Sequence, residues 1–501
     1  MLPPSGYSPP TDALLLRGTA CSGRCGEVWL NGWLILLCLV GILIVVSDGL
    51  TRPFEEDEVS LSLEPLTYEP FKGALVFAVL TLPLTLIYGR SIHVPDKEVA
   101  LLWFVMSTAA YAKDFAYVGI PQIKVFITDI VLMSCTVFDM SRLRVAMQSL
   151  GRGPRLTIAL FFISGVIAAS RGVASGQDNM LVLRDFAIVI YSIFLPVGFA
   201  FAASWDTVKR FFGFFSLGAA FCSLNALAWF IAQPGQRRYL GYGIYLVVAL
   251  IVVTLLTVNK VLKRGGWVVA TVLFLGLLLF NARAAYFAMA GSFGIVLLIG
   301  ARLQKRHDLF ARLKLGLTLA TVFGATILAL SYTGLGAAFI DRSEDEVMAA
   351  ILQPSEDPTS QFRLLAWAEA INRFADHPLF GEGYGTPFTF AIYNDDPRPH
   401  NTYLTVLYKM GLAGFIPFVL LLAMFFWRSC RILLSHRYDK QALMVYILSL
   451  VVVAQCLNGL FNYIVESPFT ASIFWLSIGM GFRMTLMLES GKRTIPEAAV
   501  A

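Results

Sequence analysis

The sequence predicts an all-α polytopic membrane protein with about 12–14 transmembrane helices. Hydrophobic residues make up 57% of the 501 residues and charged residues 14%, whereas soluble proteins carry roughly 25% charged residues. Apolar runs of spanning length follow one another along the chain, and short polar breaks separate them. This pattern excludes a chain of soluble globular domains, because the bilayer, and not a water-excluded core, sets the length of each element.

Fourteen apolar runs are the predicted spans, and two of the shorter runs also fit re-entrant or merged segments. They cover residues 29–46, 71–89, 99–118, 120–138, 156–170, 186–204, 208–232, 239–258, 267–281, 284–300, 315–333, 403–427, 442–461 and 468–488. The chain then divides into a tail (1–28), helices 1 to 11 (29–333), an outer loop (334–402), helices 12 to 14 (403–488) and a second tail (489–501). An even number of spans places both tails on one side.

The distribution of basic residues orients this bundle. Alternate loops carry clusters of lysine and arginine: Arg142, Arg144, Arg152 and Arg155; Lys209 and Arg210; Lys260, Lys263 and Arg264; Arg302, Lys305, Arg306, Arg312 and Lys314; Arg428, Arg431, Arg437 and Lys440. The positive-inside rule puts these loops and both termini in the cytoplasm, and the acidic stretch 52–69 outside. Topology and anionic lipid account for most of the net charge of +6. We therefore expect membrane lipid, and not nucleic acid, as a partner.

The outer loop predicts a helix of its own. Asp357 and Pro358 suit an N-cap and a first helical position, so residues 359–374 read as a helix. Arg363, Trp367, Ala370 and Phe374 share one face of it, which suits a helix lying at the level of the lipid headgroups. The glycine-containing segment 378–385 then ends the helix and permits a tight turn or a close backbone approach. We expect this loop to form a lid over a site.

Arginine is unusually frequent on the predicted outer side, where positive charge is normally sparse. These residues are Arg171, Arg184, Arg237, Arg238, Arg283, Arg363 and Arg398. Arg283 lies in a break so short that it must sit at the membrane boundary, and an arginine at a helix centre costs about 2.5–3.5 kcal/mol on insertion scales. A snorkelling arginine that marks a helix end is the alternative for each alone. Together they would repel one another unless an anion joins them, and guanidinium groups bind phosphate oxygens bidentately. The cluster therefore predicts a lipid-linked diphosphate.

His400 is the predicted catalytic residue. It is one of five histidines, and it lies in the segment 398–404 just before an apolar run that contains Gly411 and Gly414. A side chain that titrates near neutral pH at a membrane surface suits proton transfer on a lipid-linked substrate. The alternative is a surface histidine that is hydrogen-bonded at a helix start. Its neighbours Arg398 and Asn401 are further candidates for substrate binding.

Other motifs are weaker. Asn462 and Glu466 lie in the last outer turn, where Glu466 is interpreted as a loop carboxylate. The sequence contains no Walker loop, no Rossmann glycine pattern, no His-Glu-x-x-His helix and no paired-carboxylate metal motif. We therefore expect metal-independent chemistry without a cofactor.

Three segments together resemble the O-antigen ligase and polysaccharide polymerase superfamily, over roughly residues 237–426. Asn281-Ala-Arg-Ala-Ala is similar to the family's Ser-Arg-Gly-like segment at a helix end. Arg363 and Trp367 followed by His377-Pro-Leu-Phe-Gly-Glu-Gly resemble the family's outer loop. The closest match is His400-Asn-Thr-Tyr-Leu running into Gly411-Leu-Ala-Gly. The chain departs from the family in having Ala282 where a hydroxyl residue often precedes the arginine, and in lacking the frequent Asn after Gly241.

The resemblance implies an enzyme of the bacterial inner membrane. Members of the family transfer a glycan from undecaprenyl diphosphate to an acceptor hydroxyl on a glycan or glycolipid, with inversion and without a metal. By resemblance, His400 activates the acceptor and Arg283 holds the diphosphate. A second diphosphate arginine corresponds to Arg238, in Arg-Tyr-Leu-Gly, or to Arg184, in Leu-Arg-Asp-Phe. A protonated His400 could not act as the base, so we expect activity to fall in acid within the range of about pH 5 to 8. A polysaccharide co-polymerase is a further candidate partner.

Two functions other than glycan transfer, a flippase and an assembly scaffold, are also compatible with the sequence. Ligase and polymerase use the same donor chemistry, and the motifs do not separate them. About 14 helices with internal arginines also suit a flippase for lipid-linked glycans, although transporters commonly contain repeated halves and this sequence shows no internal repeat. A catalytically silent assembly scaffold is the third alternative. Loss of turnover without loss of donor binding in His400→Ala would separate an enzyme from the other two.

Overall fold

In the part of the chain that the structure describes, the regular secondary structure is helical apart from one short ladder, as the sequence predicts. The computed structural model describes residues 22–51, 69–116, 118–120, 125–233, 243–263, 265–280, 282–303, 358–390, 398–435 and 441–490. Within these ranges the ladder pairs Gly119–Ile120 (β1) antiparallel with Val125–Phe126 (β2). The predicted span 315–333, the acidic residues 341–346, the N-cap Asp357, the outer arginine Arg237 and the diphosphate candidate Arg238 lie outside the described residues.

The helices follow the predicted order. They are α1 (Ser22–Thr51), α2 (Glu69–Ser91), α3 (Asp96–Ala116), α4 (Ile127–Phe138), α5 (Met140–Ser149), α6 (Arg152–Ala174), α7 (Asn179–Ile190), the 3-10 turn η2 (Tyr191–Ile193), α8 (Phe194–Phe201), α9 (Trp205–Ala232), α10 (Gly243–Val258), α11 (Gly265–Phe280), α12 (Arg283–Leu303), α15 (Pro358–Asp376), α16 (Thr402–Ser435), α17 (Ala442–Asn458) and α18 (Pro468–Glu489). Among the described residues, 7 helical segments are long and apolar enough to cross a membrane, and four further apolar helices are shorter. The prediction of a polytopic all-α membrane protein is confirmed.

Several boundaries differ from the sequence prediction. The predicted span 120–138 begins as a helix only at Ile127, because the preceding residues form the ladder and Asp129 accepts a hydrogen bond from the Phe126 amide at 2.9 Å. The predicted span 186–204 is α7, η2 and α8 in succession. Helix α1 begins at Ser22, inside the predicted tail, and the basic loop after residue 138 contains α5, which buries Leu143 and Ala146.

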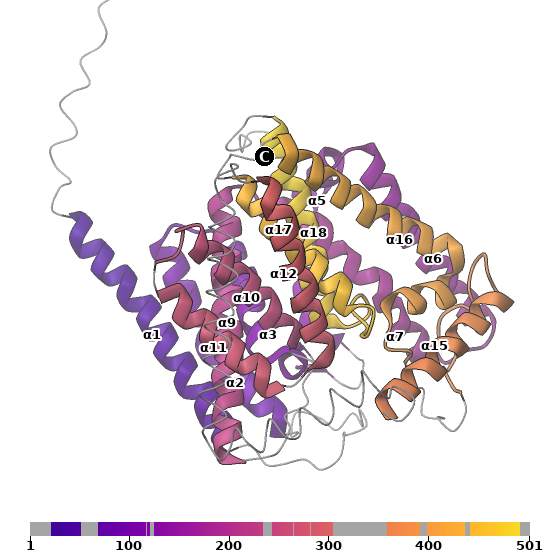
Figure 1. The fold of residues 1–501 in the computed structure, drawn as a ribbon, viewed down its shortest axis with the longest axis horizontal. Coiled ribbons are helices and arrows are strands. Elements are labelled where there is room, and N and C mark those ends of the chain that lie inside the picture. The colour runs from indigo at the N-terminus through magenta and orange to yellow at the C-terminus, as the bar shows by residue number, and fades with distance from the viewer. Residues whose placement is uncertain are drawn as a thin grey trace, which may run out of the picture.

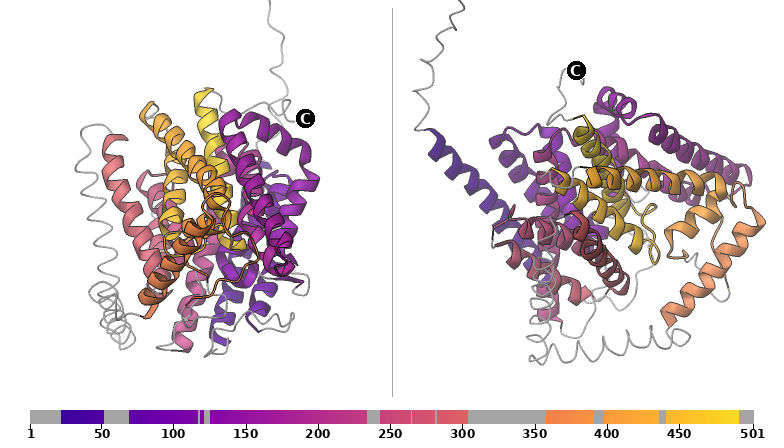
Figure 2. Two further views of the ribbon diagram at one scale, coloured as in Figure 1. Left: turned by 90° about the vertical axis from the view of Figure 1, so that its right-hand side faces the viewer. Right: turned by 45° about the horizontal axis from the view of Figure 1, so that its top comes forward.

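Helix α18 lies at the centre of the bundle, and 94% of its apolar window is buried. It packs against α8, α16 and α17, while α1, α2, α3 and α9 form one side of the molecule, and α6, α7, α15 and α16 form the other (Figures 1 and 2). Small residues let α8 and α18 approach closely, since a Cβ at Gly479 would lie 2.0 Å from the Leu195 carbonyl oxygen. Close contact through glycine is the usual means of helix association in membranes, where the surrounding lipid is as apolar as leucine.

Loops predicted to share one side of the membrane contact one another. On the predicted cytoplasmic side, Lys97 pairs with Asp139 at 2.6 Å, and Arg428 pairs with Glu489 at 2.7 Å. On the predicted outer side, the Arg171 guanidinium donates to the Gly381 carbonyl at 2.7 Å. We call the first side the basic face, after the clusters around Arg142 and Arg428, and the second the His400 face. The packing of the helices therefore agrees with the predicted alternation of loops.

Candidate functional site

His400 is held by contacts from three different elements. Asn401 caps α16, since its side-chain oxygen accepts hydrogen bonds from the amides of Tyr403 and Leu404 at 3.0 and 3.1 Å. The Trp367 indole of α15 donates to the Pro399 carbonyl at 2.9 Å. The turn that follows α17 fixes the start of α16, because the Thr402 amide donates a hydrogen bond to the Gly459 carbonyl at 2.9 Å. These contacts hold the backbone on both sides of the histidine.

The surroundings of His400 favour its neutral form. Its ring lies 5.7 Å from that of Phe362 and 5.2 Å from that of Tyr463, centroid to centroid. Burial, followed by the positive charges of Arg363 and Arg398, lowers the pKa of His400 to about 4. The imidazole is therefore neutral at neutral pH and able to accept a proton. The expected loss of activity between pH 5 and 8 is wrong for the free protein, because this pKa moves it to lower pH.

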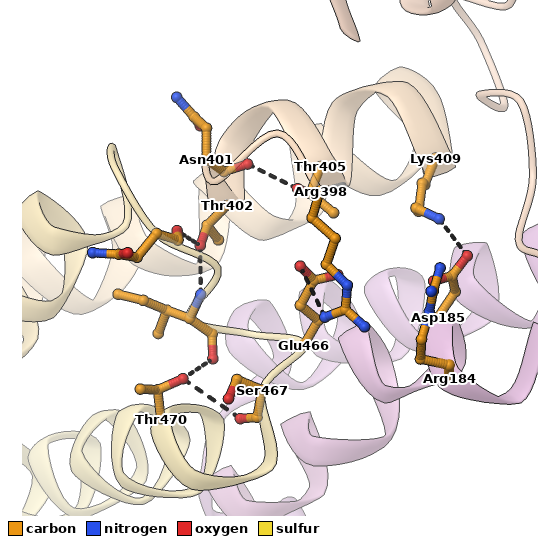
Figure 3. Close-up of polar contacts among 12 residues, drawn as sticks. Arg184, Asp185, Arg398, Asn401, Thr402, Thr405, Lys409, Glu466, Ser467 and Thr470 are labelled. Atoms are coloured by element: carbon orange, nitrogen blue, oxygen red, sulfur yellow. Dashed lines mark hydrogen bonds and ion pairs between the residues drawn. The ribbon is translucent and has the colours of Figure 1, made fainter. Parts of the chain in front are cut away.

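Arg398 forms an ion pair inside the protein. Its Nη1 lies 3.4 Å from Oε1 of Glu466, and its guanidinium carbon lies 5.3 Å from the centroid of the Tyr463 ring. The Glu466 side chain is only 2% exposed, so this loop carboxylate is a buried counter-ion of Arg398. Figure 3 shows this pair on one side of the start of α16. Arg398 thus contributes positive charge beside His400 while a carboxylate holds its position.

Two other predicted arginines, Arg363 and Arg283, are linked to this site through the Phe461 ring. The Arg363 guanidinium carbon lies 5.9 Å from its centroid, and the Trp367 ring lies 6.1 Å from it. On its other side, Phe287 of α12 packs edge-on at 5.3 Å. Phe287 follows Arg283 by one helical turn on the same helix face. The N-terminal end of α12 therefore lies beside the His400 site, as the sequence predicts for Arg283.

Arg184 belongs to a second charged cluster, which lies near the first (Figure 3). Its guanidinium donates to one oxygen of Asp185 at 3.1 and 3.2 Å, and the other oxygen accepts from the Lys409 ammonium and, at 2.9 Å, from the Gly385 amide. The side chains of Asp185 and Lys409 are 1% and 3% exposed. One buried carboxylate thus joins α7, α16 and the glycine-rich segment 381–385.

That glycine-rich segment enters a break in α16. At Gly411 the helix is interrupted, with φ 61°. The amides of Leu412 and Ala413 donate to the carbonyls of Pro378 and Leu379, and the carbonyls of Tyr408 and Lys409 accept from the amides of Glu382 and Gly383. A helix break at membrane depth requires such partners, because lipid offers no hydrogen bonds. The close backbone approach that the glycines predict is confirmed.

Helix α15 presents a different face to its neighbours than the sequence suggests. Arg363 and Trp367 point toward the His400 site, and Ala370 is buried, so this stripe is not the face turned to the headgroups. The opposite face exposes Leu364 and Ile371, at 55% and 52%. Packing of α15 on the first turns of α16 is the reason, because its buried side chains contact Tyr408 and Leu404.

Arg373 ties α15 to residues 378–389, which we call the lid segment after the role expected of them. Its guanidinium pairs with Glu369 at 2.7 Å and with Glu382 at 3.2 Å, and donates to the carbonyls of Pro387 and Thr389 at 3.0 and 2.9 Å. It also stacks over Phe388, 4.9 Å from the ring centroid. Arg373 therefore organises the loop and does not extend the arginine cluster around His400.

The structure brings together some predicted residues and adds others. Arg363 and Arg398 lie close enough to His400 to lower its pKa, Arg283 lies on the adjoining helix end, Arg184 lies in the neighbouring cluster, and Asn401 serves as a helix cap. Sequence reasoning missed the roles of Asp185, Lys409, Glu466 and Arg373. A lysine inside the apolar run 403–427 is a signal that could have identified Lys409, because ionisable residues in spanning segments are rare and functional.

The part of the chain that contains the His400 site is similar to known proteins. A family model described as O-antigen ligase matches residues 267–419, a range that contains His400, Arg283, Arg363 and Arg398. An O-antigen ligase of Pseudomonas aeruginosa is 33% identical over 75 residues. Residues 267–419 are thus similar to the O-antigen ligase family. The aligned part covers 14% of this chain and 19% of that O-antigen ligase, so the chain spans about a fifth of the curated relative's length.

Proposed function

We propose that this protein transfers a glycan from undecaprenyl diphosphate to an acceptor hydroxyl at the periplasmic face of the bacterial inner membrane. The observation that carries the proposal is a neutral, half-buried His400 between Arg363 and Arg398, within the O-antigen ligase match. The residues Arg283, Arg184 and Asn401 remain proposed contributors, the first two to diphosphate binding and the last through its capping of α16.

The proposed reaction uses two kinds of group that this face supplies. His400 takes the proton of the acceptor hydroxyl as its oxygen forms a bond to the anomeric carbon of the donor. The bond between that carbon and the diphosphate oxygen breaks, and the leaving diphosphate keeps the electron pair. Its growing negative charge is stabilised by guanidinium groups, for which Arg363 and Arg283 are the proposed residues. Attack opposite the leaving group inverts the anomeric centre, and no step in this scheme calls for a metal.

Glycan transfer is preferred to lipid-glycan flipping because the histidine and the arginines gather at one end of the bundle. A translocator would instead use ionisable groups near the midplane between repeated halves. Ligase and polymerase differ only in the acceptor, which is the lipid A core for the first and another lipid-linked repeat for the second. A co-polymerase that sets product length is a proposed partner of the polymerase alternative.

The test uses the purified full-length protein in liposomes, supplied with undecaprenyl-diphosphate-linked glycan, with and without lipid A core. Wild type is compared with His400→Ala and with His377→Ala, a control that removes an exposed histidine in the turn after α15. We expect product from wild type and His377→Ala, and a loss of at least about 100-fold in His400→Ala, the usual contribution of a positioned general base. Glycan on lipid A core indicates a ligase, and longer lipid-linked chains indicate a polymerase.

Two outcomes would contradict the proposal. Equal turnover of His400→Ala and wild type would remove His400 from the chemistry. Movement of labelled donor across the bilayer, without product from any variant, would make the protein a flippase.

A further inference from the structure

Arg483 is a buried arginine at the end of the molecule opposite the His400 face. It lies in α18, which begins at Pro468 on the His400 face and ends at Glu489 on the basic face. The residue is only 7% exposed, and its guanidinium carbon lies 5.2 Å from the centroid of the Phe199 ring of α8. At about 1.5 Å per helical residue, Arg483 lies about 9 Å from Glu489 along the helix axis, inside the apolar part of the bundle.

No acidic side chain of the described residues pairs with Arg483, whose guanidinium contacts the Phe199 ring. Its buried Nε has no hydrogen-bond partner, and its guanidinium makes no hydrogen bond or ion pair within the described ranges. Two other arginines at this end, Arg428 and Arg431, differ because both pair with Glu489. An uncompensated buried charge in a spanning helix is strongly unfavourable, and such residues mark binding sites by default.

Neighbouring helices pack closely around Arg483. Helix α8, whose Phe199 ring lies against the guanidinium, also packs against α5, which carries Arg142 and Arg144. One turn before Arg483, a Cβ at Gly479 would lie 2.0 Å from the backbone of α8, so the two helices are in direct contact there. The guanidinium therefore has no counter-ion among the described residues near the end of α18 at the basic face.

We propose that Arg483 binds the headgroup phosphate of an anionic phospholipid from the leaflet at the basic face. A planar guanidinium binds phosphate oxygens bidentately and is more weakly hydrated than an ammonium group, which suits a half-desolvated site. The depth of the residue favours a lipid, whose acyl chains lie along the apolar helices while its phosphate reaches the charge. Surplus arginine at this face selects an anionic lipid over a zwitterionic one. The site is separate from the proposed glycan transfer at the opposite face.

The test compares wild type, Arg483→Met and the control Arg428→Met, which removes an arginine of the same face that pairs with Glu489. Each purified protein is titrated in neutral detergent with phosphatidylglycerol, phosphatidylethanolamine or inorganic phosphate. Thermal unfolding and the number of lipids retained in native mass spectra are then measured. We expect phosphatidylglycerol to raise the Tm of wild type and Arg428→Met by several degrees, and to raise that of Arg483→Met by less than half as much.

Detergent without lipid gives an independent readout. Arg483→Met should be at least as stable as wild type there, because methionine removes an unpaired buried charge. If Arg483→Met does not fold, Arg483→Lys keeps the charge without the planar fork and should show a reduced phosphatidylglycerol shift. An equal shift in Arg483→Met and wild type would overturn the proposal, as would an equal effect of inorganic phosphate or of phosphatidylethanolamine. Equal losses in Arg483→Met and Arg428→Met would reduce the effect to general surface charge and would also overturn it.

Discussion

Two influences act on His400 in the same direction. Burial between Phe362 and Tyr463 disfavours the imidazolium, and the charges of Arg363 and Arg398 disfavour it further. The same arginines would lose part of this effect once an anionic donor lies beside them. The histidine is therefore set to stay neutral in the free protein and to gain proton affinity when the donor is bound, which is when a base is needed.

The pH dependence of turnover follows from this arrangement. Since the pKa of His400 is about 4 in the free protein, kcat/KM should stay level from pH 8 to 5 and fall only as the pH approaches about 4. The acid limb of kcat should lie at higher pH, because kcat reports the pKa of His400 in the complex with the donor. Initial rates measured over pH 3.5 to 8 with a lipid-linked donor check both limbs. An acid limb of kcat/KM near pH 6.5, the ordinary value for histidine, would contradict the assignment.

Asp185 and Lys409 form the other residue-scale feature, and their contributions to stability should be unequal. Asp185→Asn leaves the buried Lys409 ammonium without its carboxylate, which costs about 3–5 kcal/mol for a buried pair. Lys409→Met should cost less, because Asp185 keeps Arg184 and the Gly385 amide as partners. Thermal unfolding followed by tryptophan fluorescence gives the order of Tm values.

The matched control for this pair is Asp206→Asn. Its partner Lys209 lies 3.0 Å away on an exposed helix start, where ion pairs contribute about 0–1 kcal/mol. Its Tm should stay close to that of wild type. A Tm for Asp185→Asn as high as that of Asp206→Asn would show that the buried network does not hold the fold.

At the scale of elements, the break in α16 and the lid segment depend on each other. Residues 378–383 supply hydrogen bonds to backbone groups that the interruption at Gly411 leaves without helical partners. In return, these bonds hold the lid segment against α16. Helix α15, which also packs on α16, carries Arg363 and Trp367 to the His400 site. The lid is thus anchored by main-chain contacts at one end and by Arg373 at the other.

Gly411→Ala should disrupt this anchor. A Cβ at Gly411 would lie 2.5 Å from the Gly381 amide nitrogen and from the Leu379 carbonyl, and its φ of 61° is unfavourable for alanine. We expect a loss of about 1–3 kcal/mol, the usual range for overpacking, together with lower glycan transfer. Unfolding temperature and turnover are measured on the same preparation.

Gly213→Ala is the control for the helix-break variant. Nothing lies within 4 Å of its added Cβ inside α9, so alanine should be neutral or stabilising by up to about 1 kcal/mol. Equal unfolding temperatures for the two variants would mean that the lid segment can withdraw from the break without cost.

At the scale of the whole molecule, the charge pattern of the loops and the packing of the helices agree. Loops that the positive-inside rule assigns to one side contact one another through ion pairs, as with Lys97 and Asp139, and the outer arginine Arg171 reaches the lid at Gly381. Successive spans cross the membrane in opposite directions, so an error in the prediction of one span would have placed these partners on opposite faces. This consistency supports the positions of the described spans.

The sequence by itself determined the membrane class, the order of the described spans and the helix of the outer loop, and it predicts His400 and the outer arginines as a site. These features depend on local composition and on periodicity, which hydrophobic length and charge bias report directly. Only the tertiary structure decided that Asp185 meets Lys409, that Glu466 holds Arg398 and that residues 378–383 enter the break in α16. Those contacts join residues that lie far apart in the chain, and pairing between distant charges and backbone groups leaves no local pattern in a sequence.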